Sequence, residues 1–280
     1  MVDFVEINNA KLAYQLCGPD HAPLIITLHG GRGFGDHRSD YKAYSPLCDK
    51  YRVLSFDYRG HGKSSPTKPY TFDQIVDDIE AIRAKFAGSE KAIICGGSFG
   101  GFLAQHYAIK YPDNLSHLIL RGTAPSYHQE EDAIKVLEQR VHKAPSFSVE
   151  MLKEKVFGAF QSDLEFQLVH LAMMPLYSEI FDANAALASC LNNMYNAESH
   201  NDLYNEEQKY FDYREKLPLI KAKTLVVVGS EDWICPVQHS EYIAAKIPGA
   251  ELFVVKEANH SVHLEKNAEV LTRIRSHLST

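Results

Sequence analysis

Residues 91–108 read KAIICGGSFGGFLAQHYA, and this stretch decides the fold. Its first part, 91–95, is a short apolar run typical of a buried strand, and its last part, 101–108, is typical of a helix. Between them stands Ser98, flanked by glycines on both sides. A serine on a sharp strand-to-helix turn forms a nucleophile elbow, in which small neighbours leave room for a strained backbone and the hydroxyl stays exposed. We therefore expect Ser98 at the carboxyl edge of a sheet; an ordinary glycine-rich loop is the alternative.

Other short apolar runs recur along the chain with the same character as residues 92–95. Their length and residue type are typical of strands buried on both faces, as in a parallel sheet. Helix-length segments separate most of them, and residues 71–86 begin with Thr71 as a plausible cap. This alternation predicts an α/β fold with a mostly parallel, doubly wound sheet. The other runs are 24–28, 53–56, 118–120, 225–228 and 252–255, and the other helical segments are 236–247 and 264–278.

The alternation stops between residues 125 and 215, where apolar residues recur only at helical spacing. This segment carries 16 Asp and Glu against 7 Lys and Arg and holds four of the five methionines, in a chain whose net charge is −7. We therefore expect a helical cap at 125–215 inserted into a core made of 1–124 and 216–280. The cap is either a subdomain with an ordinary core or a lid whose methionines give a substrate pocket a pliable wall, and the two interpretations are compatible.

Composition excludes several classes of protein. A net charge of −7 and a pI near 6.0 argue against nucleic acid or an anionic membrane as partner. No apolar run is long enough to span a bilayer, and the first residues do not have the features of a secretory signal. The five scattered cysteines are typical of free thiols in a reducing compartment, and neither they nor the histidines show metal-ligand spacing. We expect a cytoplasmic protein with no metal and no cofactor.

A base and an acid for Ser98 can be sought after the later strands, because a serine hydroxyl is a weak nucleophile without them. Asp232 follows the run 225–228, and we prefer it to its neighbour Glu231. His260 follows the run 252–255, whereas His263 is expected in the first turn of the last helix. The order serine, acid, histidine matches that of the nucleophile-elbow folds. The sequence therefore predicts the triad Ser98–His260–Asp232.

Attack of a serine on a carbonyl makes an oxyanion, which fixed backbone N–H groups stabilise. One donor is expected to be Phe99, the residue after the nucleophile. The other is expected in the glycine-rich loop after the run 24–28, and Gly31 is the preferred residue there. Asp57 is a reserve candidate for the acid, although it precedes the serine and more simply fixes the turn that follows it.

These motifs together make the chain resemble the α/β-hydrolase superfamily over essentially its whole length. Such a resemblance implies an α/β-hydrolase fold with a sheet of about eight strands and a helical cap after the sixth. Within the superfamily the chain is similar to the prolyl aminopeptidase, or proline iminopeptidase, group. The motifs that carry the resemblance are His29-Gly30-Gly31, Asp57-x-Arg59-Gly60-x-Gly62-x-Ser64, Gly96-Gly97-Ser98-Phe99-Gly100-Gly101, Gly229-x-x-Asp232, and His260 followed by Glu265.

The chain departs from that group at three positions. The group usually has Pro at the place of Arg32, Trp or Tyr at the place of Phe99, and Gly at the place of Asn259. Cap glutamates bind the free amine of the substrate in the group, but no motif here assigns that role. The acidic candidates in this cap are Glu198, Glu206, Glu207 and Glu215.

Three functions remain open from the sequence. The first is a hydrolase of small esters, lactones or amides that works through an acyl-enzyme, and Arg32 favours an apolar or anionic acyl group. The second is removal of an N-terminal residue from short peptides, and the third is a ligand receptor with little turnover. A small molecule or short peptide is the expected partner, and the oligomeric state is left open. The residues expected to bind substrate are Gly30, Arg32, Trp233, Met173 and Met194.

Overall fold

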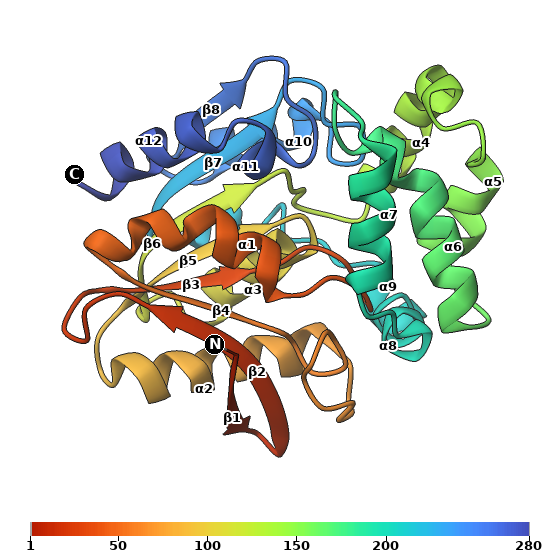
Figure 1. Ribbon diagram of the computed structural model, residues 1–280. Coiled ribbons are helices and arrows are strands. Elements are labelled where there is room, and N and C mark those ends of the chain that lie inside the picture. Colours follow the sequence, from red (N-terminus) through yellow and green to blue (C-terminus); the bar gives the residue numbers. More distant parts are fainter. Residues whose placement is uncertain (1, 280) are drawn as a thin grey trace.

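A computed structural model describes residues 2–279. The chain forms one eight-stranded sheet in the order β1-β2-β4-β3-β5-β6-β7-β8 (Figure 1). The strands from β3 onward pair in parallel, whereas β2 pairs antiparallel with both β1 and β4. This sheet confirms the predicted fold class. The strands are β1 (Asp3–Ile7), β2 (Ala10–Cys17), β3 (Leu24–Leu28), β4 (Arg52–Phe56), β5 (Ala92–Gly97), β6 (Leu115–Arg121), β7 (Lys223–Gly229) and β8 (Glu251–Val255).

The six apolar runs of the sequence form β3 to β8, and the hairpin of β1 and β2 is the part that the run pattern did not identify. In β1 buried and exposed residues alternate at its end, with Val5 and Ile7 facing inward. Asn8 and Asn9 make the two-residue turn with φ of 48° and 65°. Two positive φ values are what a tight hairpin needs, and asparagine tolerates them. An edge hairpin of this kind buries one face only, so it lacks a continuous apolar run.

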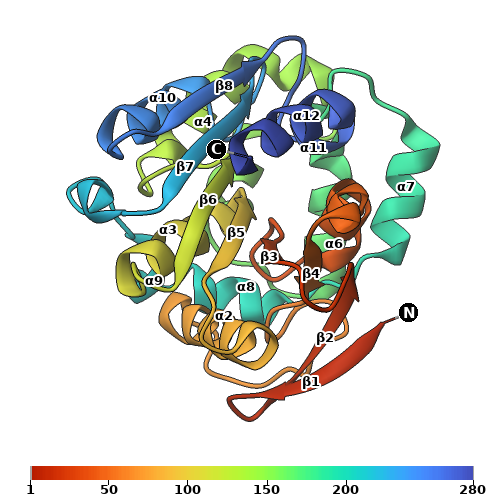
Figure 2. The same cartoon turned by 90° about the vertical axis from the view of Figure 1, so that its left-hand side faces the viewer.

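Helices cover both faces of the sheet (Figure 2). One apolar cluster joins α2, α3 and α10 to one face, and a second joins α1, α11 and α12 to the other. The predicted cap Thr71 accepts the N–H of Gln74 at 3.2 Å and begins α2. The last predicted helix is divided into α11 and α12. These helices are α1 (His37–Tyr44), α2 (Phe72–Ala87), α3 (Phe99–Lys110), α10 (Val237–Lys246), α11 (Val262–Glu265) and α12 (Asn267–Leu278).

The chain between β6 and β7 is helical, and the described residues there form no strand. These helices lie together beyond one end of the sheet (Figure 1). They have an apolar cluster of their own, to which Trp233 of the core also belongs. The helices are α4 (Gln129–Arg140), α5 (Val149–Met151), α6 (Asp163–Met173), α7 (Ala183–Asn192), α8 (Ala197–Leu203) and α9 (Glu206–Lys209). Five single turns complete the chain: η1 (Ser45–Asp49), η2 (Val141–Lys143), η3 (Leu152–Val156), η4 (Met174–Leu176) and η5 (Leu217–Leu219).

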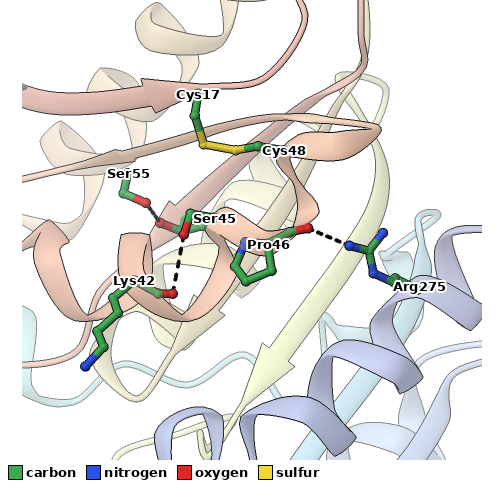
Figure 3. Close-up of a disulfide and its surroundings, with 8 residues drawn as sticks. Cys17, Lys42, Ser45, Pro46, Cys48, Ser55 and Arg275 are labelled. Carbon is green, nitrogen blue, oxygen red and sulfur yellow. Dashed lines mark hydrogen bonds between the residues drawn. A yellow bond between two sulfur atoms is a disulfide. The ribbon is translucent and has the colours of Figure 1, made fainter.

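A disulfide between Cys17 and Cys48 contradicts the prediction that all five cysteines are free thiols. It ties the end of β2 to η1, and the two Cα atoms are 5.8 Å apart (Figure 3). The pairing comes from the fold, because the antiparallel contact of β2 with β4 brings Cys17 beside a turn 31 residues further along the chain. Spacing in the sequence gave no sign of it. Cys95, Cys190 and Cys235 are free and buried.

Membrane insertion through a helix is not supported for the described residues. Within residues 2–279 no helix combines the length and the apolar character that crossing a bilayer requires.

Candidate active site

Ser98 stands between β5 and α3 in a backbone conformation that side chains rarely adopt, with φ 53° and ψ −122°. Its N–H donates to the carbonyl of Arg121 at 3.0 Å, and its carbonyl accepts from Gly101 at 2.9 Å. The turn needs a glycine at position 100, because a Cβ there would collide with the carbonyl of Leu28. The surroundings thus hold a strained serine in place, as is typical of functional turns.

His260 and Asp232 meet at the carboxyl ends of β8 and β7. The Nδ1 atom of His260 lies 2.9 Å from Oδ2 and 3.0 Å from Oδ1 of Asp232. Asp232 is 4% exposed, and its Oδ1 also accepts the N–H of Cys235 at 2.9 Å and that of Ile234 at 3.2 Å. The carboxylate is therefore fixed by the backbone and in turn fixes the imidazole. The neighbour Glu231 binds Arg140 instead, with 2.7 Å between its Oε2 and Nη2 of the arginine.

Ser98 and His260 line the same cavity, which has a volume of about 510 Å³. Their strands are parallel, so both carboxyl ends open at the same edge of the sheet. Within residues 2–279 no hydrogen bond joins the Ser98 hydroxyl to the imidazole. Catalytic hydrogen bonds often form only when substrate binds, so this arrangement is compatible with a triad.

Gly31 and Phe99 both have N–H groups without a partner among the described residues. Phe99 is the first residue of α3, where a helix leaves its N–H groups unsatisfied and carries positive potential. Gly31 has φ 89°, and a Cβ there would come within 2.5 Å of the carbonyl of Phe34. Both residues line the cavity, as an oxyanion hole requires.

The structure brings some of the predicted substrate-binding residues to the cavity and leaves others out. Gly30, Arg32 and Met173 line it. Trp233 does not, because it is fully buried against Tyr177 with 5.7 Å between the ring centroids. Met194 does not either, since its side chain is 55% exposed outside the cavity. These two predictions are wrong.

Several cavity residues were missed by the sequence reasoning. Most come from the helical segment between β6 and β7, where no strand end marks a position as functional. Tyr177 lies beside the imidazole of His260, with ring centroids 5.5 Å apart. His263, which the sequence places in the first turn of the last helix, lies in α11 as expected and yet lines the cavity. The other missed residues include Phe34, Asp36, Phe102, Arg121, Gln129, Phe157, Phe166, His170, Met174, Ile180, Phe181, Asp182, His200 and Tyr204.

The charges on the cavity wall are few. Burial lowers the pKa of His170 and of His200 to about 4, so both imidazoles are neutral near pH 7. Arg121 is paired with the buried Asp40, with 3.1 Å between Nη2 and Oδ1. Burial also lowers the pKa of His263 well below its usual value. Arg32 is therefore the cation of the wall that has no carboxylate bound to it.

Glu130 of α4 is buried near this arginine. It is 8% exposed, and its Oε1 has no hydrogen-bond partner. Burial raises the pKa of Glu130 to about 7, against the opposing charges of Arg32 and Lys209. The folded protein therefore holds a proton that the unfolded chain releases above about pH 4.5. The free energy of unfolding consequently falls as the pH rises through this interval.

The substitution Glu130→Gln should remove that dependence. We expect the stability of the variant relative to the parent protein to increase by roughly 2–3 kcal/mol between about pH 5 and about pH 8. Urea denaturation at a series of pH values measures this difference. Glu215→Gln, at an exposed position, is the control and should follow the parent at every pH. If the difference in unfolding free energy between Glu130→Gln and the parent stays constant with pH, folding does not raise the pKa of Glu130.

One group of described residues has the donor atoms for a metal ion, namely Asp36, His37 and Asp57, with ligand atoms within 4.8 Å of one another. These atoms already have partners. Asp57 accepts from Nδ1 of His37 at 2.6 Å and from the N–H of Lys63 at 2.8 Å, while Asp36 binds Arg38 at 2.6 Å. Asp57 therefore fixes the turn that follows it, which is the role that the sequence favoured. We assign no metal to the group.

Comparison with known proteins identifies the class. The family model for the alpha/beta hydrolase fold matches residues 23–267, so the chain belongs to this family and is a serine hydrolase enzyme. Among its curated relatives, the proline iminopeptidase PfmaB of Pestalotiopsis fici is 72% identical over 279 residues, which are 99% of each chain. A proline iminopeptidase of Xylella fastidiosa (strain Temecula1) is 27% identical and covers 93% of this chain and 90% of its own.

Solved structures share the fold. The meta-cleavage product hydrolase CumD of Pseudomonas fluorescens IP01 matches with a TM-score of 0.77 at 19% identity, over 99% of this chain and 97% of its own. The enol-lactonase of Burkholderia xenovorans LB400 matches with a TM-score of 0.75 at 22% identity, over 99% of this chain and all of its own. At these identities the similarity concerns the fold alone.

Proposed function

We propose that Ser98, His260 and Asp232 form a catalytic triad for acyl transfer. The observation that carries this is the backbone-held Asp232–His260 pair in the same cavity as a strained serine at a helix N-terminus. His260 takes the proton of Ser98 as the hydroxyl attacks the substrate carbonyl, and Asp232 stabilises the resulting imidazolium. The N–H groups of Gly31 and Phe99 bind the oxyanion.

The reaction then continues through an acyl-enzyme. His260 gives its proton to the leaving group, which departs, and the acyl group remains on Ser98. A water molecule enters and loses a proton to His260 as it attacks the ester, and a second oxyanion forms in the same hole. Collapse of this intermediate returns the proton to Ser98 and releases the acid.

We propose that residues 125–215 act as a cap over this cavity. Side chains of this segment line the cavity that Ser98 also lines, among them Phe157, Met173 and Tyr204. Such a wall excludes water from the reacting carbonyl and strengthens the electrostatic interactions inside. The prediction that methionines contribute to the wall fits Met173 and Met174.

We propose a small ester, lactone or amide as the substrate, with an acyl part that is neutral or anionic. The carboxylates on the cavity wall besides the triad are Asp36 and Asp182. Asp36 is bound to Arg38, and Asp182 accepts two N–H groups at the start of α7. Asp36 is thus already paired with an arginine, and Asp182 is an exposed helix cap, whereas Arg32 is a buried cation on the same wall.

Release of an N-terminal residue from a peptide is the second candidate, and the 72% identical relative named proline iminopeptidase favours it. Its requirement is a carboxylate for the free amine. None of the four glutamates proposed for this role lines the cavity. Glu198, for example, binds Lys68 at the surface at 2.8 Å.

A parallel substrate panel separates these functions. We expect short p-nitrophenyl esters and acyl lactones to be hydrolysed with kcat/KM about 100-fold or more above proline and alanine p-nitroanilides. The physical reason is the buried cation on the wall, which no carboxylate of the described residues binds. If the proline anilide is the better substrate, the peptidase function replaces the ester hydrolase. Tight binding without repeated turnover of any substrate would instead indicate the receptor.

We also infer that the partner is a small molecule or a short peptide and that nucleic acid and membranes are not partners, because the net charge is −7. A cytoplasmic location stays a prediction. The Cys17–Cys48 disulfide is the observation against it, since disulfides persist mainly in oxidising compartments.

A further inference from the structure

The guanidinium of Arg32 is buried without its full set of partners. Arg32 is 4% exposed, and within the described residues the one hydrogen bond of its guanidinium runs from Nη1 to the carbonyl of Leu203 at 3.2 Å. The Nε and Nη2 atoms are buried and have no acceptor. A guanidinium is always charged and can donate five N–H bonds. Burying it with donors unpaired is costly unless another group accepts the remaining bonds.

Aromatic rings surround this cation. The ring of Tyr204 lies 3.9 Å from Cζ, and four phenylalanine rings lie at 5.2 to 5.7 Å. The faces of such rings attract a cation, which explains how the charge is tolerated inside the protein. The face of a ring is only a weak acceptor for an N–H group, so the need for a strong acceptor remains. The four phenylalanines are Phe72, Phe99, Phe102 and Phe211.

No carboxylate of residues 2–279 satisfies that need. Glu130 is the acidic group that acts on Arg32 through space, but no hydrogen bond joins the two within the described residues. Oε2 of Glu130 lies 3.8 Å from Nζ of Lys209 instead. A buried carboxyl with a pKa of about 7 is only partly ionised near pH 7, which makes it a weak counter-ion.

The position of Arg32 ties it to the reaction. It follows Gly31, one proposed oxyanion donor, and its Cζ lies 5.7 Å from the ring of Phe99, whose N–H is the other. The carbonyl of Arg32 is bound to Nδ1 of His200 at 3.0 Å, so a cap helix holds its backbone. Arg32 and Ser98 line one cavity. An acyl group on Ser98 can therefore extend toward the guanidinium.

We propose that Arg32 is a specificity-determining residue that binds a carboxylate carried by the acyl part of the substrate. A carboxylate presents two oxygens in one plane, and the Nε and Nη2 donors that lack partners form a matching pair on one edge of the guanidinium. The substrates are accordingly half-esters or lactones of acids that keep a second, free carboxylate. This inference rests on the proposed function and names its substrate class.

Two p-nitrophenyl esters of equal size test the proposal. One is the mono-ester of adipic acid, and the other has a carboxamide in place of the free carboxylate. The parent enzyme should hydrolyse the acid with kcat/KM about tenfold or more above the amide, because a charge-assisted pair is lost with the amide. Arg32→Gln should reduce this ratio to about one while it still hydrolyses the amide, and Arg32→Lys should keep part of the preference.

The control is Arg214→Gln, which removes a surface arginine paired with Asp212 and should leave the ratio unchanged. Equal hydrolysis of both esters by the parent enzyme, or an unchanged preference in Arg32→Gln, overturns the proposal. If Arg32→Gln does not fold, the ratio of kcat/KM for the acid to that for the amide is measured on Arg32→Lys instead. A ratio equal to that of the parent then overturns the proposal.

Failure of the proposed function gives a different result. If the parent enzyme turns over neither ester, calorimetry on the parent protein with monomethyl adipate and its carboxamide analogue tests Arg32 by binding alone. Tighter binding of the acid, lost in Arg32→Gln, supports the carboxylate site without any hydrolysis. Equal binding of the two ligands would refute it.

Discussion

Ser98→Ala should lose about a thousandfold or more in kcat against the best ester, while the protein folds as before. The hydroxyl is the only atom removed, and within the described residues it makes no hydrogen bond whose loss would leave a buried partner unpaired. The backbone at position 98 keeps its Cβ, so the turn remains as it is. Hydrolysis at steady state and a thermal melt of both proteins measure the two effects.

The matched control for this substitution is Ser146→Ala, at an exposed position outside the cavity around Ser98. It should keep the activity and the melting temperature of the parent. Activity of Ser98→Ala within tenfold of the parent would remove Ser98 from the mechanism.

Asp232→Asn should lower kcat by about 10³ to 10⁴. The reason lies in the contacts of this side chain, because Oδ1 accepts the N–H groups of Cys235 and Ile234. An asparagine keeps those bonds only with its oxygen on that side, and its NH₂ group then faces Nδ1 of His260. The imidazole must accept this N–H bond and carry its own proton on Nε2. In that tautomer it cannot take the proton of Ser98.

The pH profile distinguishes this effect from damage to the fold. The lost activity should return in part at high pH, where hydroxide deprotonates the nucleophile without help from His260. Asp113→Asn, which removes a surface partner of Lys221, is the control and should behave as the parent. Full activity of Asp232→Asn at neutral pH would exclude Asp232 as the residue that orients the base.

The parallel part of the sheet could be predicted from the sequence because its strands are buried on both faces and appear as continuous apolar runs. The β1–β2 hairpin escaped this pattern, since an edge hairpin alternates buried and exposed residues. Asn8-Asn9 was the local indication of its turn. The Cys17–Cys48 bridge escaped for another reason, because only the antiparallel pairing of β2 brings the two residues together.

The residues of the candidate site also divide into those that the sequence could locate and those that it could not. Ser98, Asp232 and His260 could be located because each follows a parallel strand, and the carboxyl ends of such strands share one edge. No such rule locates the residues of the helical segment between β6 and β7 that line the rest of the cavity. Helical residues such as Met173 and Met194 have the same chemistry in the sequence, yet one lines the cavity and the other is exposed.

The sequence by itself determined the parallel part of the sheet, the elbow and the order of the reactive residues, because continuous apolar runs and the strained turn are local properties of short segments. Only the tertiary structure decided which groups meet across the cavity. Arg32 shows the difference: its charge is plain in the sequence, but its aromatic neighbours come from α2, from α3 and from the residues that follow α8 and α9. Whether a buried cation has an acceptor depends on these long-range contacts, and here they leave two buried donors of Arg32 without one among the described residues.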